Sequence, residues 1–238
     1  MHTLHPVSKL DIRCLICYLG EVELYHVFNR GVDKRDVVLD DSDRARFVHD
    51  LYAFNNADIV FHVSQPVRSR ETAVDKRKLL VHIHAFCLMK NHYHLILSGA
   101  QENGVPHFMQ KLNMGYTKYF NERYDRTGTL WQGKYKKVLV GNDAHYMYLP
   151  YYIHLNPLDF VTPEWRDGKV HNVKEALASL NEYRWSSHLD YLGKKNFPSV
   201  IEKKLMADVF GSPARYEKEL IDIIGNEHRT PGNLIMEN

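Results

Sequence analysis

Cysteine is scarce in this chain of 238 residues, which contains only three, and an odd number argues against a disulfide framework. Cys14 and Cys17 form a Cys-x-x-Cys pair, but the sequence has no second pair to complete a four-ligand zinc site. It also has no run of 18 apolar residues, which argues against a transmembrane helix. Residues 1–7 lack the basic flank and apolar stretch of a signal peptide. We therefore expect a cytoplasmic protein that does not enter a membrane.

Charge of one sign is also scarce. Lysine and arginine total 31 against 29 acidic residues, so the net charge is +2, too small to indicate a nucleic-acid partner by itself. The distribution is less even, because basic residues clearly outnumber acidic ones over residues 68–78 and 118–137. Such clusters are typical of a phosphate-binding surface, and equally of an ordinary solvated surface. Both interpretations stay open on composition alone.

The length suits one domain with appendages or two small domains, and a hydrophobic content of 44% is enough for a core. We expect an irregular lead-in over residues 1–20 and a main unit over 21–195. An inserted loop at about 56–78 would interrupt the main unit. A small helical tail would follow over 196–238.

Hydrophobic periodicity in the main unit predicts the order strand, helix, strand, strand, helix, strand. This order is typical of an α+β fold, the ferredoxin-like split β-α-β antiparallel sheet with helices on one face. A further helix is expected over 143–155, where Pro150 predicts either a kink or a new start. The six elements are expected at 21–30, from Asp41-Ser42 as cap to about Asn55, and at 79–89, 92–97, 105–124 and 134–140.

Two histidines occur at alternate positions of the predicted strand that begins at residue 92. Alternate strand residues point to the same face, so His92 and His94 should project together while Tyr93 turns away. Two imidazoles on one rigid face are suitable ligands for a divalent metal. Two solvent-facing or hydrogen-bonded structural histidines would give the same pattern.

The turn before this strand sets the register of the hairpin. If Lys90 and Asn91 form a two-residue turn, Cys87 pairs with His94. His82 and His84 would then lie on the opposite face of the sheet from His92 and His94. We interpret His82 and His84 as structural residues.

The helix expected at 143–155 leads into a second group of polar side chains. Tyr152 and Asn156 are four residues apart and would share one helical face, whereas Tyr151 is rotated by about 100°. A phenol that acts as nucleophile, two imidazoles and an amide oxygen are the parts needed to cleave a phosphodiester covalently. The alternative is that Tyr152 is an ordinary half-buried aromatic, since the chain has 15 tyrosines.

Five short segments in order along the chain carry a resemblance to a known family. They are 25–31 (Tyr-His-Val-Phe-Asn-Arg-Gly), 85–95 (Ala-Phe-Cys-Leu-Met-Lys-Asn-His-Tyr-His-Leu), 128–134 (Gly-Thr-Leu-Trp-Gln-Gly-Lys), 152–157 (Tyr-Ile-His-Leu-Asn-Pro) and 183–187 (Tyr-Arg-Trp-Ser-Ser). With these segments the chain resembles the REP-associated, single-tyrosine transposases of the HUH type, which are IS200-like. The resemblance covers roughly residues 21–195.

The resemblance implies the HUH variant of the ferredoxin-like sheet. It also implies metal-dependent nicking and rejoining of single-stranded DNA, often at hairpin-forming repeats, through a 5′-phosphotyrosine. His92 and His94 correspond to the metal ligands, Tyr152 to the nucleophile and Asn156 to the third ligand. The expected cofactor is Mg²⁺ or Mn²⁺, and the expected partner is single-stranded or hairpin DNA. A homodimer stays open.

The chain departs from the family pattern at two positions near these residues. Lys90 stands where proline is usual, and Pro150 interrupts the helix that carries Tyr152. Pro150 favours an alternative function, a non-catalytic hairpin DNA or RNA binder of the same fold, whereas the four intact site residues favour the enzyme. A zinc-dependent hydrolase is disfavoured because no general-base carboxylate flanks the histidine pair.

A set of basic residues and one tryptophan are candidates for binding DNA. For each basic residue the alternative is a solvated surface charge, and for the tryptophan it is core packing rather than base stacking. The predicted DNA contacts are Arg30, Lys118, Arg123, Lys134 and Lys136, with Trp131 as a stacking surface.

Overall fold

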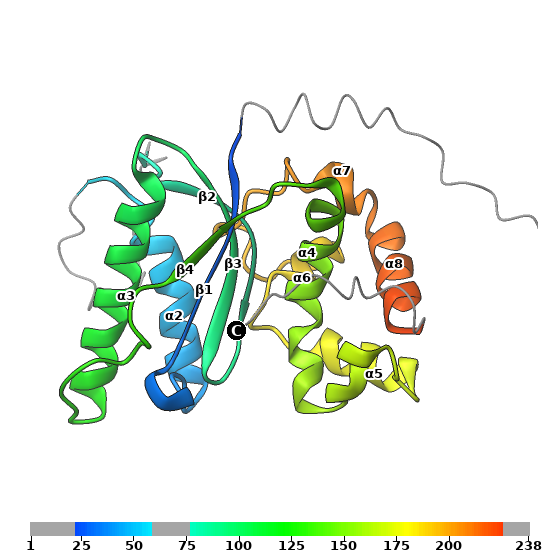
Figure 1. Ribbon diagram of the computed structural model, residues 1–238, viewed down its shortest axis with the longest axis horizontal. Helices are drawn as coiled ribbons and strands as arrows, with labels where there is room; N and C mark the ends of the chain where they lie inside the picture. The colour runs from blue at the N-terminus through cyan, green and yellow to red at the C-terminus, as the bar shows by residue number, and fades with distance from the viewer. Residues whose placement is uncertain (1–21, 59–76, 226–238) are drawn as a thin grey trace, which may run out of the picture.

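A four-stranded antiparallel sheet forms the centre of the molecule, in the strand order β2-β3-β1-β4 (Figure 1). The computed structural model describes residues 22–58 and 77–225. With one helix in each crossover, this is the split β-α-β order predicted from periodicity, so the fold class is confirmed. The strands are β1 (Leu24–Arg30), β2 (Val81–Leu88), β3 (His92–Gly99) and β4 (Lys136–Leu139).

Three features expected from the sequence lie outside the described residues. They are the lead-in, the Cys14–Cys17 pair and most of the inserted loop. Within the described part, no helix is long and apolar enough to cross a membrane.

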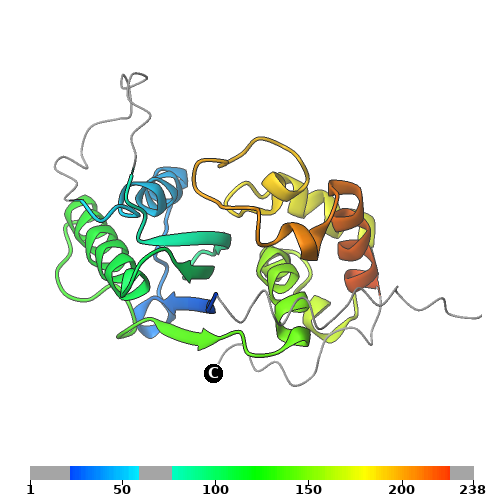
Figure 2. The same cartoon turned by 90° about the horizontal axis from the view of Figure 1, so that it is seen from above.

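Two helices, α2 (Asp41–Ala53) and α3 (Gly104–Arg123), cover one face of the sheet (Figures 1 and 2). The cap of α2 differs from the prediction, because the Asp40 side chain accepts the backbone N–H groups of Ser42 and Asp43. A Cβ added at Gly115 of α3 would lie 2.4 Å from the ring of Phe54, just after α2. The small residue therefore sets the close approach of the two helices.

The chain beyond β4 covers the other face of the sheet, so that the sheet lies between two helical layers (Figure 2). α4 packs directly on β2 and β3. It is one helix with Pro150 inside it, so the predicted alternative of a new start at Pro150 is wrong. The elements of this layer are α4 (Asp143–Leu155), η2 (Asn156–Phe160), η3 (Pro163–Asp167), α5 (Val173–Glu182), α6 (His188–Tyr191), α7 (Ala207–Phe210) and α8 (Pro213–Gly225).

The hairpin register is as predicted near the turn and differs farther away. Cys87 pairs with His94, but a bulge between Ile83 and Ala85 shifts the pairing, so that His82 pairs with Ser98. Ser98 lies on the same face of β3 as His94, and the His84 Nε2 atom is 2.8 Å from Ser98 Oγ. The prediction that His82 and His84 face away from His94 is therefore wrong. One extra residue in a strand reverses which side chains face each layer.

Candidate active site

The histidine pair lies on β3, on the face that α4 covers. The His92 and His94 ring centroids are 5.0 Å apart and the rings are nearly perpendicular. Tyr93 points to the other layer, where its hydroxyl donates to Asn113 of α3. His94 is fully buried and His92 is partly exposed. The strand thus presents the two imidazoles together toward α4.

A hydrogen bond at Nδ1 suits the His92 ring to metal binding, and a second bond at Nδ1 holds the His94 ring in place. The His92 Nδ1 atom is 2.6 Å from Asn91 Oδ1, and the Asn91 amide nitrogen donates to the carbonyl of Lys34. Because Asn91 Oδ1 can only accept, His92 Nδ1 donates and Nε2 carries the lone pair that a metal requires. The His94 Nδ1 atom is 2.9 Å from His26 Nε2 on β1, and the two rings stack. His26 is a neighbour of the pair that sequence reasoning did not assign.

The side chains of these two histidines would need oxygen ligands to complete a metal site. In residues 22–58 and 77–225, no group of three or more His, Cys, Asp or Glu side chains is arranged to hold a metal ion. Two imidazoles with an amide oxygen, water and phosphate suit Mg²⁺ or Mn²⁺ better than a closed zinc site. The donor set is therefore compatible with the cation expected from the resemblance.

Tyr152 lies on α4 with its ring edge-on to His94, at a centroid distance of 6.0 Å. The Asn156 side chain donates from Nδ2 to the backbone carbonyl of Tyr152 at 2.8 Å, so the two residues are held as one unit. Tyr152 is only 6% exposed and Asn156 is fully buried. The structure thus brings the predicted nucleophile to the histidine pair across the sheet–helix contact.

An arginine that the sequence analysis missed joins these groups. Arg166 donates from Nη1 to the Tyr152 hydroxyl at 2.7 Å and from Nη2 to Asn156 Oδ1 at 2.9 Å. Asp159 binds the other edge of the guanidinium, with Nε–Oδ1 and Nη2–Oδ2 distances of 3.0 and 2.7 Å. Burial alone would lower the pKa of Arg166, but the hydrogen bonds to Asp159 and Tyr152 raise it above its usual value.

Arg166 lies in η3, where no hydrophobic period marks its position in the sequence. The preceding Trp165 packs against Tyr152, and its indole N–H donates to Asp159. The only signal in the sequence was an arginine beside a tryptophan shortly after Asn156, which does not specify a contact.

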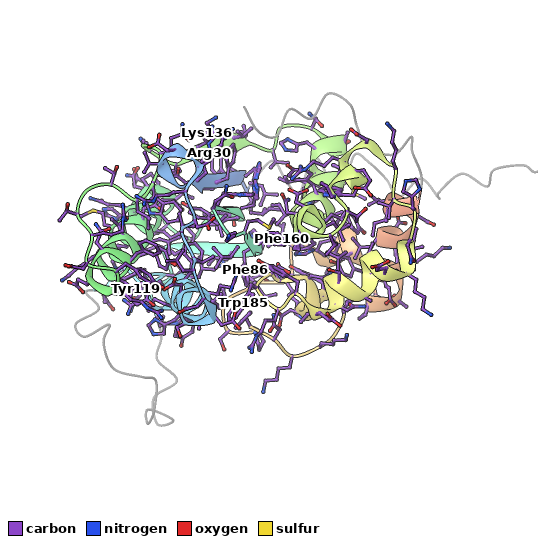
Figure 3. All side chains as sticks on the ribbon, turned by 90° about the horizontal axis from the view of Figure 1, so that it is seen from below. Arg30, Phe86, Tyr119, Lys136, Phe160 and Trp185 are labelled. Carbon is purple, nitrogen blue, oxygen red and sulfur yellow. The ribbon has the colours of Figure 1, made fainter. Side chains whose placement is uncertain are left out.

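A basic cleft of about 450 Å³ opens beside His92. It includes Arg30, Lys134 and Lys136, three of the residues predicted to grip DNA, and Figure 3 shows Arg30 and Lys136 at the same edge of the sheet. The Arg30 Nε atom donates to Gln132 Oε1 at 2.6 Å, which orients that amide. The residues that line the cleft are Phe28, Asn29, Arg30, Lys34, Asn91, His92, Gln132, Lys134 and Lys136.

The other predicted DNA contacts lie elsewhere. Lys118 and Arg123 are on α3, in the layer across the sheet from Tyr152. The Arg123 guanidinium pairs with Asp40 and Asp43, and so braces α3 against the start of α2. Trp131 is 5% exposed and its indole N–H donates to the carbonyl of Asn113, which is the core position given as the alternative to stacking.

Comparison with known families supports the resemblance. The model of a family described as "Transposase IS200 like" matches residues 70–156, a segment shorter than half of the chain. This confirms the resemblance to IS200-like transposases. The matched segment contains the histidine pair and Tyr152 and ends at Asn156, so Arg166 lies beyond it.

Similarity to individual proteins was found among solved structures. No curated protein matches the chain. Among solved structures, one described as "Structure of the REP associates tyrosine transposase bound to a REP hairpin" is similar, with 11% identity and a TM-score of 0.46. The alignment covers 77% of this chain and 87% of that one.

Proposed function

We propose that this protein is a DNA strand transferase that nicks and rejoins single-stranded DNA through a covalent bond to Tyr152. The single observation that carries the proposal is the edge-on contact of Tyr152 with His94 of the histidine pair. The match of residues 70–156 to IS200-like transposases supports the choice of DNA as substrate. As in the family that the motifs resemble, hairpin-forming repeats are the proposed targets.

The reaction is an exchange of phosphate ester bonds. The Tyr152 oxygen attacks the phosphorus, the Oη–P bond forms and the P–O3′ bond breaks. The phenolic proton passes to water, and the departing 3′ oxygen takes up a proton to become a hydroxyl. The DNA stays joined by its 5′ phosphate to Tyr152, so a 3′ hydroxyl can reverse the exchange without a nucleotide cofactor.

His92, His94 and Asn156 are the proposed holders of Mg²⁺ or Mn²⁺. When bound, such a cation acts as a Lewis acid on a phosphate oxygen. The chain's own contribution is orientation: Asn91 and His26 fix the two imidazoles, and the Asn156 amide is tied to the backbone of Tyr152.

The cleft beside His92 is the proposed path of the single strand. Its basic side chains are suited to phosphate oxygens, and the Gln132 amide, which Arg30 orients, is suited to a base edge. Because His92 lies in the wall of this cleft, a strand bound there would pass the histidine pair.

The test is a labelled single-stranded hairpin incubated with the protein and Mn²⁺. We expect a covalent protein–DNA adduct that survives denaturation. Tyr152→Phe should form none, whereas the matched control Tyr151→Phe should form it normally, because Tyr151 packs between Phe210 and Tyr216 away from the histidines. An adduct that persists in Tyr152→Phe would refute the assignment of the nucleophile.

A second function is favoured by the burial of Tyr152, of which only 6% is exposed. A protein that keeps the fold and binds hairpins without cleaving them would have no need of an accessible phenol. In the same experiment, tight hairpin binding by the wild type with no adduct at any Mn²⁺ or Mg²⁺ concentration would favour this binder.

A further inference from the structure

The Arg166 side chain is the most constrained cation near the candidate nucleophile. Its guanidinium donates to the Tyr152 hydroxyl oxygen at 2.7 Å, the atom that would form the bond to phosphorus. It also lies over the ring of Trp165, at 4.8 Å from the centroid. Charge, contact and orientation therefore converge on one oxygen atom.

We propose that Arg166 is a catalytic residue of the strand transfer, which stabilises negative charge on the Tyr152 oxygen in both directions of the reaction. The inference rests on the proposed function and adds a residue outside the segment matched by the family model. Asp159 is then a positioning residue, because it holds the guanidinium by two hydrogen bonds and acts on Tyr152 through Arg166.

The direction of the charge change supports this role. A phenol at neutral pH is almost wholly protonated, so its oxygen gains negative charge on the way to attack. In rejoining, the same oxygen begins as a neutral ester and gains negative charge as the Oη–P bond breaks. A fixed cation on that oxygen favours the transition state over the starting state in both cases.

Arginine suits this position better than lysine would. The guanidinium stays charged at any ordinary pH, and its planar set of donors can bind several oxygens at once. Here Nη1 takes the Tyr152 oxygen while Nη2 takes Asn156 Oδ1 at 2.9 Å and one oxygen of Asp159. The Asn156 oxygen has a second lone pair, so its bond to Arg166 is compatible with its proposed role as metal ligand.

The competing explanation is that Arg166 only fastens η3 to α4. In that case its removal would loosen the fold, and a small soluble cation would not replace it. Rescue by added guanidinium separates the two roles, because a free guanidinium ion can restore the missing charge at the reacting oxygen but, being unattached to η3, cannot hold η3 on α4.

The experiment measures single-turnover adduct formation, and rejoining by an added 3′-hydroxyl strand, on a labelled hairpin at fixed Mn²⁺. Hairpin affinity and thermal unfolding are measured on the same samples. We expect Arg166→Ala to slow both steps by about 10²-fold, the effect of removing one charge-stabilising donor, with hairpin affinity little changed. Guanidinium at a sub-denaturing concentration should restore part of the rate in Arg166→Ala and not in Tyr152→Phe.

Three further variants serve as controls and graded tests. Arg215→Ala removes an exposed arginine on α8 and should react like the wild type. Arg166→Lys should be intermediate, because it keeps a charge and loses the paired donors. Asp159→Asn should slow the reaction less than Arg166→Ala. If Arg166→Ala fails to fold, Arg166→Lys and Asp159→Asn carry the same test.

The outcomes separate this inference from the proposal on which it rests. A wild type that forms no adduct refutes the proposed function and the inference with it. A wild type that reacts, with a folded Arg166 variant that reacts equally fast, refutes only the inference. The inference is also refuted if Arg166→Ala folds and reacts slowly but guanidinium does not accelerate it. Arg166 would then only hold η3 on α4.

Discussion

The two layers on either side of the sheet use their polar residues in different ways. In the α2–α3 layer, the buried Asp43 accepts hydrogen bonds from Arg123, Tyr119 and Tyr124. In the α4 layer, Arg166 bonds Tyr152 and Asn156 beside the histidine pair. In the first layer, the buried Asp43 carboxylate joins two helices. In the second layer, the Arg166 guanidinium donates a hydrogen bond to a phenol. Under the proposed function, one face of the sheet is structural and the other, the chemical face, carries the reaction.

The basic residues follow the same division. Arg123 in the α2–α3 layer is paired with two carboxylates, Asp40 and Asp43. In the cleft, the Arg30 side chain donates to the neutral side chain of Gln132. A cation whose neighbours are neutral retains more of its attraction for phosphate. Local charge counts in the sequence could not separate these two situations.

The largest expected effect on the reaction comes from disrupting the proposed metal site at the histidine pair. His94→Ala should reduce adduct formation by at least about 10²-fold, as should chelation of divalent metal in the wild type. Its control is His49→Ala, a partly exposed histidine on α2. Equal activity in His94→Ala and the wild type would contradict the assignment of the reaction to the α4 layer.

A large effect on stability is expected from the structural face. Asp43→Ala leaves Arg123 and two tyrosine hydroxyls without their buried carboxylate, and should lower the free energy of unfolding by about 3 kcal/mol. Denaturant unfolding measures it, with the exposed Asp41→Ala as matched control. Adduct formation per folded molecule should be unchanged, and a selective loss of activity would contradict the assignment of this layer.

The chemical layer should be the more sensitive to acid. Burial lowers the pKa of His188 to about 3, with a further contribution from Lys194, while the unfolded chain titrates near its usual value of 6.5. Between these values the unfolded state binds the extra proton, so stability falls as the pH drops below about 6.5, by about 1.4 kcal/mol per pH unit at most for this group. Denaturant unfolding from pH 7 to 4 tests this, and His188→Gln should flatten the slope.

The smallest expected effect is on the affinity for hairpin DNA. Lys134→Ala with Lys136→Ala should weaken hairpin binding and reduce the slope of log affinity against log salt by about 0.7 for each phosphate that the variant no longer neutralises. Lys118→Ala, on α3, should change neither quantity. If Lys118→Ala weakens binding as much as the cleft variants do, the DNA path runs over the other layer.

Local rules explain most of what the sequence predicted. The pairing of Cys87 with His94 follows from a two-residue turn, and the bounds of α4 follow from its cap at Asn142 and the stop at Asn156-Pro157. The bulge near His84 was not predictable, since one extra residue leaves no mark in a mostly buried strand. Arg166 was not predictable because η3 reaches Tyr152 only when the chain folds back over α4.

The role of Tyr152 as nucleophile can be tested by mass spectrometry of the protein after reaction with a short single-stranded hairpin and Mn²⁺, followed by nuclease and protease digestion. We expect a nucleotide attached through its 5′ phosphate to Tyr152. A nucleotide attached to any other side chain, or a cleaved hairpin with no protein-bound nucleotide, would contradict it.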